Sequence, residues 1–286
     1  MRTSMSEVQI VLTGLGIGES PRWHDGRLWF SNWGMQEVVA VDISGRSEIM
    51  VRVPATIPFS IDWLPDGRLL VVSGPDRLLL RRETDGSLVT HADLSPHAEH
   101  ACNEIVVDGL GNAYINGGSF DPPGQNVPSG IIALVARDGS IRQVADGISF
   151  PNGMAVTADG STLIIAESHG KRLTAFNIGA DGNLTNRRVW ADLGDGVPDG
   201  ICIDADNAVW YADVPNKRCV RVREGGEVLQ MVNVDRGCFA CMLGGPERTT
   251  LFIMAAEWHG FAKMLDGLGT GQVLAVKAPA PGVGWP

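Results

Sequence analysis

One sequence position, polar in five of its six copies, recurs at intervals of 41 to 49 residues, each time where a short apolar run begins. In chain order, the residues at this position are Glu19, Ser60, Asn103, Asn152, Asp199 and Ala240. Four of the six copies carry a carboxylate or an amide, and both groups offer an oxygen to a ligand. A repeat of about 40 to 50 residues indicates a solenoid, a propeller or an array, so the structure inside the repeat decides the fold.

Each repeat contains two short apolar runs separated by an Asp-Gly turn or a close variant of it. In the fourth unit the two runs are residues 154–157 and 163–166, and residues 173–177 form a third. Such runs are typical of β-hairpins, and no stretch of ten or more residues keeps a helical apolar period. We therefore predict an all-β fold, a six-bladed β-propeller of four-stranded blades, with residues 1–286 as one domain. Residues 8–12 are expected to add an outer strand that closes the ring.

The charge balance limits the partners of the chain. Its 286 residues include 23 Lys and Arg against 33 Asp and Glu, a formal net charge of −10. This excess of negative charge disfavours nucleic acid and anionic membranes and favours a small-molecule partner. The N-terminus shows no secretory signal, no segment is apolar enough to span a bilayer, and five scattered cysteines indicate reduced thiols. We therefore expect a cytoplasmic protein. No pattern in the sequence indicates an oligomeric state.

The recurring position predicts a cation site. The innermost strand of each propeller blade lines the central channel, so residues that begin these strands should meet at one mouth of it. Glu19 and Asp199 would repel each other there unless a positive charge lay between them. With the amides of Asn103 and Asn152, they form a set of hard oxygen donors that favours Ca²⁺, Mg²⁺ or Mn²⁺. The alternative is that these side chains only cap strands and hydrogen-bond to the backbone or to channel water.

The motifs around these positions resemble those of the SMP-30/gluconolactonase/regucalcin-like family over nearly the whole chain. The matching segments are GESPRW at 18–23, Asn103 with Asp108 and Gly111, PNGMA at 151–155, and PDGI at 198–201. The resemblance implies one catalytic divalent metal held by the residues at Glu19, Asn152 and Asp199, with Asn103 beside it to contact substrate. The resemblance also implies that the protein is a lactonase. Ca²⁺ is the metal we expect first, and Zn²⁺, Mn²⁺, Mg²⁺ and Fe²⁺ also occur in the family.

An open coordination position would let such a metal activate water, with Asp199 accepting the proton, so we predict hydrolysis of a lactone, a cyclic ester. Sugar lactonases of this family carry an Arg-x-Asn-Asp pattern where this chain has Ala101-Cys102-Asn103-Glu104. The missing guanidinium argues against a simple aldonolactone as substrate. Two alternatives stay open: a phosphotriesterase or fluorophosphatase-like hydrolase, and a non-catalytic calcium-binding regulatory propeller.

Two similar loops indicate the walls of the substrate pocket. Residues 166–170 (AESHG) resemble residues 256–260 (AEWHG), and both follow the second strand of their unit. Loops after second strands open on the face where first strands begin. The candidate pocket residues are therefore His169, His259, Trp33, Phe120 and Trp258, with His100 from the loop before the third unit. Alternatively, Glu167 and Glu257 hold the turns while both histidines face solvent.

Overall fold

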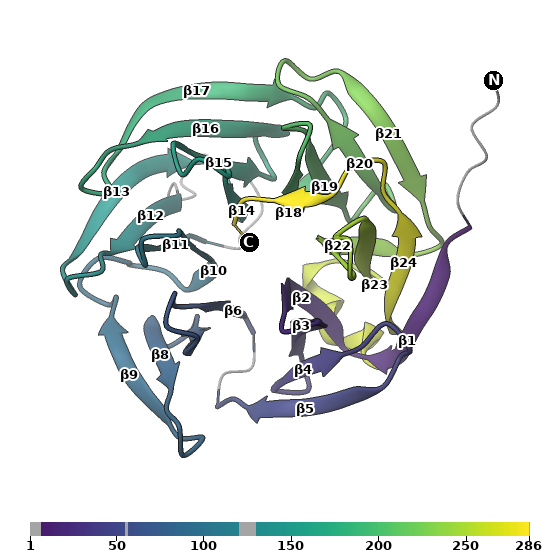
Figure 1. The fold of residues 1–286 in the computed structure, drawn as a ribbon, viewed down its shortest axis with the longest axis horizontal. Coiled ribbons are helices and arrows are strands. Elements are labelled where there is room, and N and C mark those ends of the chain that lie inside the picture. The colour runs from purple at the N-terminus through teal and green to yellow at the C-terminus, as the bar shows by residue number, and fades with distance from the viewer. Residues whose placement is uncertain (1–6, 55–56, 120–129, 286) are drawn as a thin grey trace.

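The computed structural model describes residues 7–54, 57–119 and 130–285. Within these residues, six antiparallel sheets are arranged radially around a central axis (Figure 1). In the sheets that begin with β2, β6, β10 and β14, the strands follow in chain order from the axis toward the rim. The predicted fold, a six-bladed β-propeller, is confirmed.

The first three blades run in chain order from the axis outward. They comprise β2 (Ile17–His24), β3 (Arg27–Trp33), β4 (Glu37–Val41) and β5 (Ser47–Arg52); β6 (Phe59–Trp63), β7 (Leu69–Ser73), β8 (Leu78–Arg82) and β9 (Leu88–Asp93); and β10 (Cys102–Val107), β11 (Ala113–Gly117), β12 (Gly130–Val135) and β13 (Ile141–Ile148).

The next two blades have the same order, and the sixth takes its outer strand from the N-terminus. These comprise β14 (Pro151–Val156), β15 (Thr162–Glu167), β16 (Arg172–Ile178) and β17 (Leu184–Asp192); β18 (Pro198–Asp204), β19 (Val209–Asp213), β20 (Arg218–Val222) and β21 (Val228–Asn233); and β22 (Gly237–Gly244), β23 (Thr250–Ala256), β24 (Gly271–Lys277) and β1 (Gln9–Leu15).

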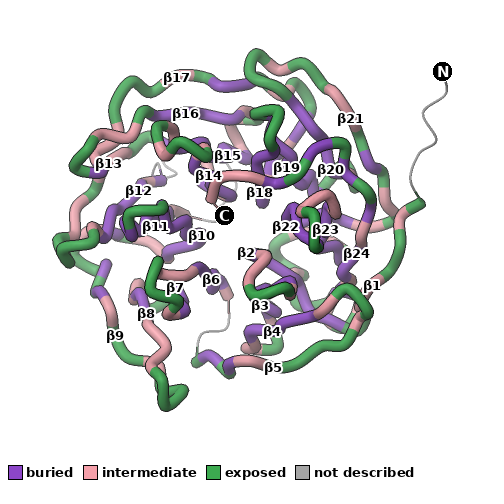
Figure 2. The backbone as a smooth tube through the Cα atoms, in the orientation of Figure 1, coloured by how far each residue is buried: buried purple, intermediate pink, exposed green. Residues whose placement is uncertain are grey.

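The burial of the strands explains their sequences. Inner strands such as β10 and β22 are buried along their whole length, so both of their faces carry apolar or hydrogen-bonded side chains. Outer strands such as β17 are largely exposed, as Figure 2 shows at the rim. In the tight turn between β14 and β15, Gly160 adopts a φ of 71°, which glycine accepts without strain. The hydrophobic core thus lies between the blades.

The ring closes where β1 joins the last blade. Strand β1 pairs antiparallel with β24, with Gln9 opposite Ala275, which confirms the predicted closing strand. A short strand, β25 (Gly282–Val283), adds to the inner edge of the fifth blade by pairing with β18. Because Ile203 and Asp204 make this pairing, β25 lies at the end of β18 opposite to Asp199. The C-terminal segment therefore covers one mouth of the channel and leaves the other mouth to the site described below.

A 3-10 helix, η1 (Phe261–Gly267), follows β23 and was not predicted. Its seven residues are too few to show a helical period in the sequence. The described residues contain no helix that is long and apolar enough to cross a membrane.

Candidate active site

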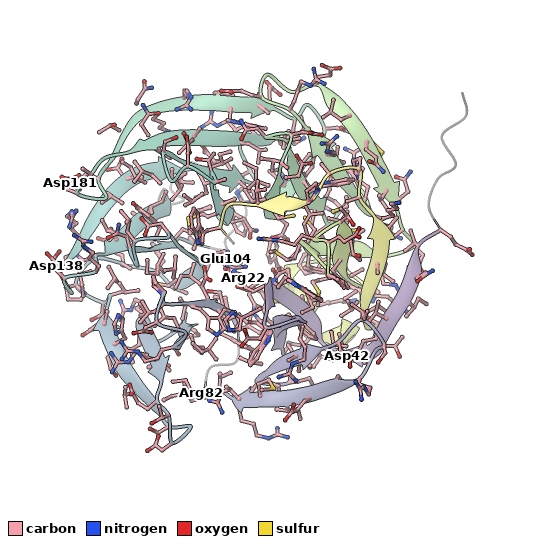
Figure 3. The ribbon with its side chains drawn as sticks, in the orientation of Figure 1. Arg22, Asp42, Arg82, Glu104, Asp138 and Asp181 are labelled. Carbon is pink, nitrogen blue, oxygen red and sulfur yellow. The ribbon has the colours of Figure 1, made fainter. Side chains whose placement is uncertain are left out.

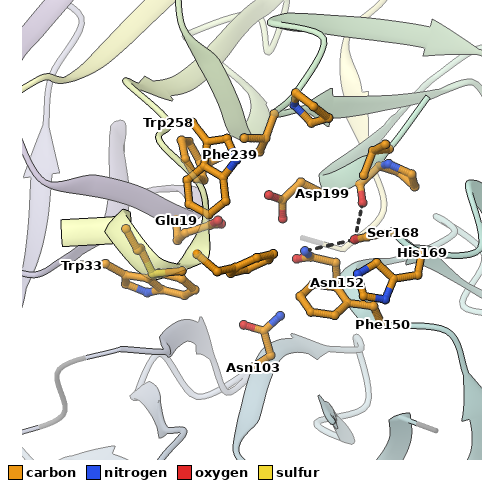
Figure 4. Close-up of a pocket in the computed structure, with 16 residues that line it drawn as sticks. Glu19, Trp33, Asn103, Phe150, Asn152, Ser168, His169, Asp199, Phe239 and Trp258 are labelled. Atoms are coloured by element: carbon orange, nitrogen blue, oxygen red, sulfur yellow. Dashed lines mark hydrogen bonds between the residues drawn. The ribbon is translucent and has the colours of Figure 1, made fainter. Parts of the chain in front are cut away.

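Four inner strands contribute oxygen-bearing side chains to one cavity of about 180 Å³ at the channel mouth. Glu19 comes from β2, Asn103 from β10, Asn152 from β14 and Asp199 from β18. In Figure 4 these side chains point toward a common space. The structure thus brings together the four residues that the repeat pattern selected. The other two copies of the repeated position, Ser60 and Ala240, are buried and are not among the described residues lining this cavity.

Glu19 and Asp199 are two carboxylates placed in an apolar cavity. Burial raises the pKa of Glu19 well above its ordinary value, and the charge of Asp199 raises it further. Burial also raises the pKa of Asp199, and the nearby charge of Glu104 adds to that rise. Asp199 Oδ1 is inaccessible to solvent and has no hydrogen-bond partner among the described residues. A cation in the cavity would reverse both effects and supply the missing partner.

The two amides are oriented by neighbouring groups. Asn152 Nδ2 donates to Ser168 Oγ at 3.4 Å, and Ser168 Oγ in turn donates to the carbonyl oxygen of Pro198 at 2.7 Å. This chain of hydrogen bonds leaves Asn152 Oδ1 available to the cavity. Asn103 Nδ2 donates to the carbonyl oxygen of Pro151 at 3.3 Å, which uses one of the two N–H groups of that amide.

The donor set fits a hard divalent cation. Two carboxylates and two amide oxygens are the ligand types that Ca²⁺ and Mg²⁺ prefer, whereas zinc and copper sites are built from thiolates and imidazoles. The described residues hold no group of three or more His, Cys, Asp and Glu side chains that could bind a metal. The set in this cavity contains two carboxylates and two amides. All five cysteines are buried, and none is in a disulfide.

A buried ionic cluster lies below the cavity, near the axis, where Figure 3 labels Arg22 and Glu104. Glu104 Oε1 accepts hydrogen bonds from Ser20 Oγ at 2.8 Å, from the Ile105 amide at 2.8 Å and from Arg22 Nη2 at 3.3 Å. Asp62 Oδ2 lies 3.6 Å from Arg22 Nε. Ser20, which adopts a φ of 51°, also accepts from the Ile61 amide at 3.0 Å. This cluster therefore holds the backbone next to Glu19.

Sequence reasoning missed the ionic cluster as a supporting element. Arg22 stands inside the motif at 18–23, and Glu104 follows Asn103 directly, so both lay within segments that had been singled out. The signal that was available is the pairing of a basic and an acidic residue on buried inner strands, where neither would be stable alone.

The second strands end in residues that form the walls of the cavity. Ser168 and His169 follow β15, Val214 follows β19, and Trp258 follows β23 by two residues. Glu167, the last residue of β15, is fully buried and accepts hydrogen bonds that hold the turn. Its donors are the Ser149 amide at 2.8 Å, Thr174 Oγ1 at 2.5 Å, Arg172 Nη2 at 3.0 Å and Arg187 Nη2 at 3.1 Å. Burial acts against ionisation, but these donors outweigh it and lower the pKa of Glu167.

Aromatic rings make up most of the remaining wall. Trp258 contacts Phe239 and Phe261 edge to face, with ring centroids 5.7 Å and 5.1 Å away. Phe261, on η1, lies 5.9 Å from Phe150, and Phe150 lies 4.5 Å from the ring of His169. The rings therefore form a continuous aromatic surface beside the oxygen donors (Figure 4).

The candidate pocket residues have different positions. Trp33, Trp258 and His169 line the cavity. His259 does not line it within the part of the chain that is described, and its Nε2 lies 3.5 Å from Glu257 Oε2 on a half-exposed side chain. His100 lines a separate cavity of about 370 Å³. Phe120 lies outside the described residues. The substrate contacts of His100 and His259 stay predictions.

Comparisons with known proteins agree with this architecture. Residues 17–257 match the SMP-30/gluconolactonase/LRE-like region. The chain is 26% identical to regucalcin of Xenopus laevis over 93% of each chain. It is 27% identical to the diisopropyl-fluorophosphatase of Loligo vulgaris over 62% of this chain and 63% of that protein. The structure of a gluconolactonase of Xanthomonas campestris superposes with a TM-score of 0.75 at 20% identity, covering 96% of this chain and 90% of that one. The chain belongs to the SMP-30/gluconolactonase/LRE-like family.

Proposed function

We propose that this protein is a metal-dependent hydrolase that opens a lactone. One observation carries the proposal: four oxygen donors from four separate inner strands line a single cavity, and one of them, Asp199 Oδ1, is buried without a partner. A pair of buried carboxylates is unfavourable without a nearby positive charge, which supports a bound divalent cation. The family, whose description includes gluconolactonase, supports the lactone as substrate.

In this proposal, Glu19, Asn152 and Asp199 hold the cation, and Ca²⁺ is the ion that the all-oxygen donor set favours. When bound, the cation would polarise the ester carbonyl and lower the pKa of a water molecule. Ser168 supports this arrangement because its hydrogen bond to Asn152 Nδ2 keeps the amide oxygen directed into the cavity.

Asp199 and Asn103 carry the remaining chemistry. The carboxylate of Asp199 accepts the proton of the attacking water. Asn103 uses one N–H on the Pro151 carbonyl, and the other N–H donates to the ester oxygen as negative charge develops on it. Trp258 contacts the substrate from the opposite wall. The proposal keeps the expectation that the substrate is not a simple aldonolactone, since Ala101 stands where an arginine is expected and the described cavity wall contains no Lys or Arg.

A phosphotriester hydrolase is the second candidate, because the chain is similar to a diisopropyl-fluorophosphatase. Both reactions need a polarised oxygen and an activated water, so the donor set alone does not separate them.

Elemental analysis of the purified protein, followed by a pH-indicator assay on a panel of lactones beside a phosphotriester, tests the proposal. We expect one divalent cation per chain, lactone turnover that stops on chelation and returns with added cation, and little phosphotriester hydrolysis. Asp199→Asn protein serves as the blank. Bound cation without turnover of any ester would point instead to a non-catalytic regulatory propeller. Dominant phosphotriester hydrolysis would favour the second candidate.

A further inference from the structure

Apart from its oxygen donors, the cavity is strongly apolar. Ten of the sixteen described residues that line it are apolar, and none is Lys or Arg. Ser168 has its hydroxyl engaged with Pro198 and Asn152, so His169 is the polar side chain left beyond the four donors. A substrate in this cavity therefore meets no cationic partner from the described wall and few hydrogen-bonding groups.

The apolar wall has a defined shape because its rings pack on one another. Trp258 lies between Phe239 and Phe261, both in edge-to-face contact with it. Such contacts fix ring orientation and add to the energy of burial. Trp33 Nε1 donates to the carbonyl oxygen of Phe59 at 2.6 Å, so its polar atom is satisfied. The part of the indole that faces the cavity is hydrocarbon. The rings thus offer a preformed surface for an apolar group.

The size of the cavity limits that group. Sites for drug-sized ligands measure about 300–1,000 Å³, whereas this cavity measures about 180 Å³. A lactone ring with a short alkyl or phenyl substituent fits this volume better than a large ester. A ring carrying several hydroxyl groups would turn them toward Trp and Phe side chains, and burying a hydroxyl without a partner is unfavourable.

Given the proposed hydrolase function, we propose that the substrate is a neutral lactone bearing a short apolar substituent. That substituent packs on Trp258 and Phe261 while the ester group faces Glu19 and Asp199. Trp258 and Phe261 are then the residues that determine specificity. Residues of η1 that do not line the cavity do not determine specificity.

The test measures kcat/KM for γ-lactones whose alkyl chain grows by one methylene at a time, beside a hydroxylated five-membered lactone. In the unmodified protein we expect kcat/KM to rise about fourfold per methylene until the cavity is filled, because each buried methylene contributes about 0.8 kcal/mol. The hydroxylated lactone should react more slowly than the shortest alkyl lactone. A rate that does not depend on chain length, or a preference for the hydroxylated ring, would overturn the inference.

A matched pair of variants on η1 tests whether the cavity wall determines the dependence on chain length. Phe261 lines the cavity, whereas Leu265, also on η1, is 54% exposed and does not line it in the described structure. Phe261→Ala and Trp258→Ala should flatten the rise with chain length, and Leu265→Ala should leave it unchanged. Equal behaviour of Phe261→Ala and Leu265→Ala would contradict the proposed role of Phe261. Unchanged melting temperatures would show that each variant is folded.

A binding experiment separates this inference from the proposed function. Alkyl-substituted γ-lactams resemble the lactones but resist hydrolysis, so calorimetric titration of the calcium-loaded protein measures their affinity without turnover. Affinity that rises with chain length, and stops rising in Trp258→Ala, supports the apolar wall even where no lactone is hydrolysed. Lactam affinity that rises with chain length, together with no hydrolysis of any lactone, would reject the lactonase function alone. Hydrolysis of lactones together with chain-independent lactam binding would reject the apolar wall alone.

Discussion

Two kinds of buried carboxylate stand at the same end of this propeller, and their surroundings differ. Glu167, at the end of a second strand, is fully buried and receives two arginines, a hydroxyl and a backbone amide, which lower its pKa. Glu19 and Asp199, at the start of inner strands, make no ion pair with any described residue, and their pKa values are raised. A carboxylate of the first kind is satisfied by the protein itself. We propose that the second kind is completed by a bound cation.

Glu104, in the buried ionic cluster, is intermediate between these two kinds of carboxylate. Burial raises the pKa of Glu104, but Arg22, Ser20 and the Ile105 amide oppose the rise. Burial alone therefore does not indicate a metal site. The proposed metal site rests instead on the unpartnered Oδ1 of Asp199 and on the lack of an ion pair to Glu19 or Asp199 among the described residues.

The largest expected effect comes from replacing the unpartnered carboxylate. Asp199→Asn keeps the shape of the side chain but removes its charge and its capacity to accept a proton, so kcat/KM should fall about 10³- to 10⁴-fold. Steady-state assays with saturating cation measure this change, and circular dichroism checks the fold. Activity within tenfold of the parent protein would show that Asp199 belongs with the satisfied carboxylates.

Replacing Arg22, the arginine of the buried ionic cluster, should have the next largest effect, a loss of stability. Arg22→Met leaves Asp62 and Glu104 buried without their common partner. The side chains of Arg22, Asp62 and Glu104 are 6%, 10% and 8% exposed. Loss of one member of a buried pair costs about 3–5 kcal/mol of unfolding free energy. Urea denaturation measures this loss. A change below about 1 kcal/mol would mean that the cluster is not held together by its charges.

Added cation should stabilise the protein through Glu19 and Asp199. At a Ca²⁺ concentration 100 times the Kd, the free energy of unfolding should rise by about 2.7 kcal/mol. Glu19→Gln should lose most of this gain, and in chelator it should melt above the unmodified protein because carboxylate repulsion is relieved. Scanning calorimetry with and without Ca²⁺ measures both effects. The matched control is Glu167→Gln, which should keep the full calcium response.

The smallest expected effect concerns pH. The pKa of Glu167 is lower in the folded protein than in the unfolded chain, so its stabilising contribution is complete above the unfolded pKa and is lost as pH falls through the folded value. The unmodified protein should therefore lose more stability than Glu167→Gln on going from pH 5 to pH 3. The effect is modest because both arginines are 36% exposed. Parallel pH profiles of the two proteins would contradict the ion pairs.

The parts of the molecule that repeat were predictable, and the parts that do not repeat were not. The spacing of Glu19, Asn103, Asn152 and Asp199 indicates both the ring and their convergence, because a propeller brings equivalent positions to its axis. Helix η1 occurs once, so no periodicity reveals that it brings Phe261 to the cavity. His100 was expected near substrate from its place in a long loop, but sequence separation does not determine the direction of a loop, and the structure places this residue beside another cavity.

The pairing of β1 with β24 has a consequence for how the protein is made. Gln9 leaves the ribosome long before its partner Ala275 has been synthesised. The sixth sheet therefore stays incomplete until β24 has been synthesised, and until then β1 presents an open strand edge. Such an edge can pair with another chain. Nascent copies on one messenger are thus exposed to aggregation through β1 during this interval, and a chaperone that shields the first strand would act in it.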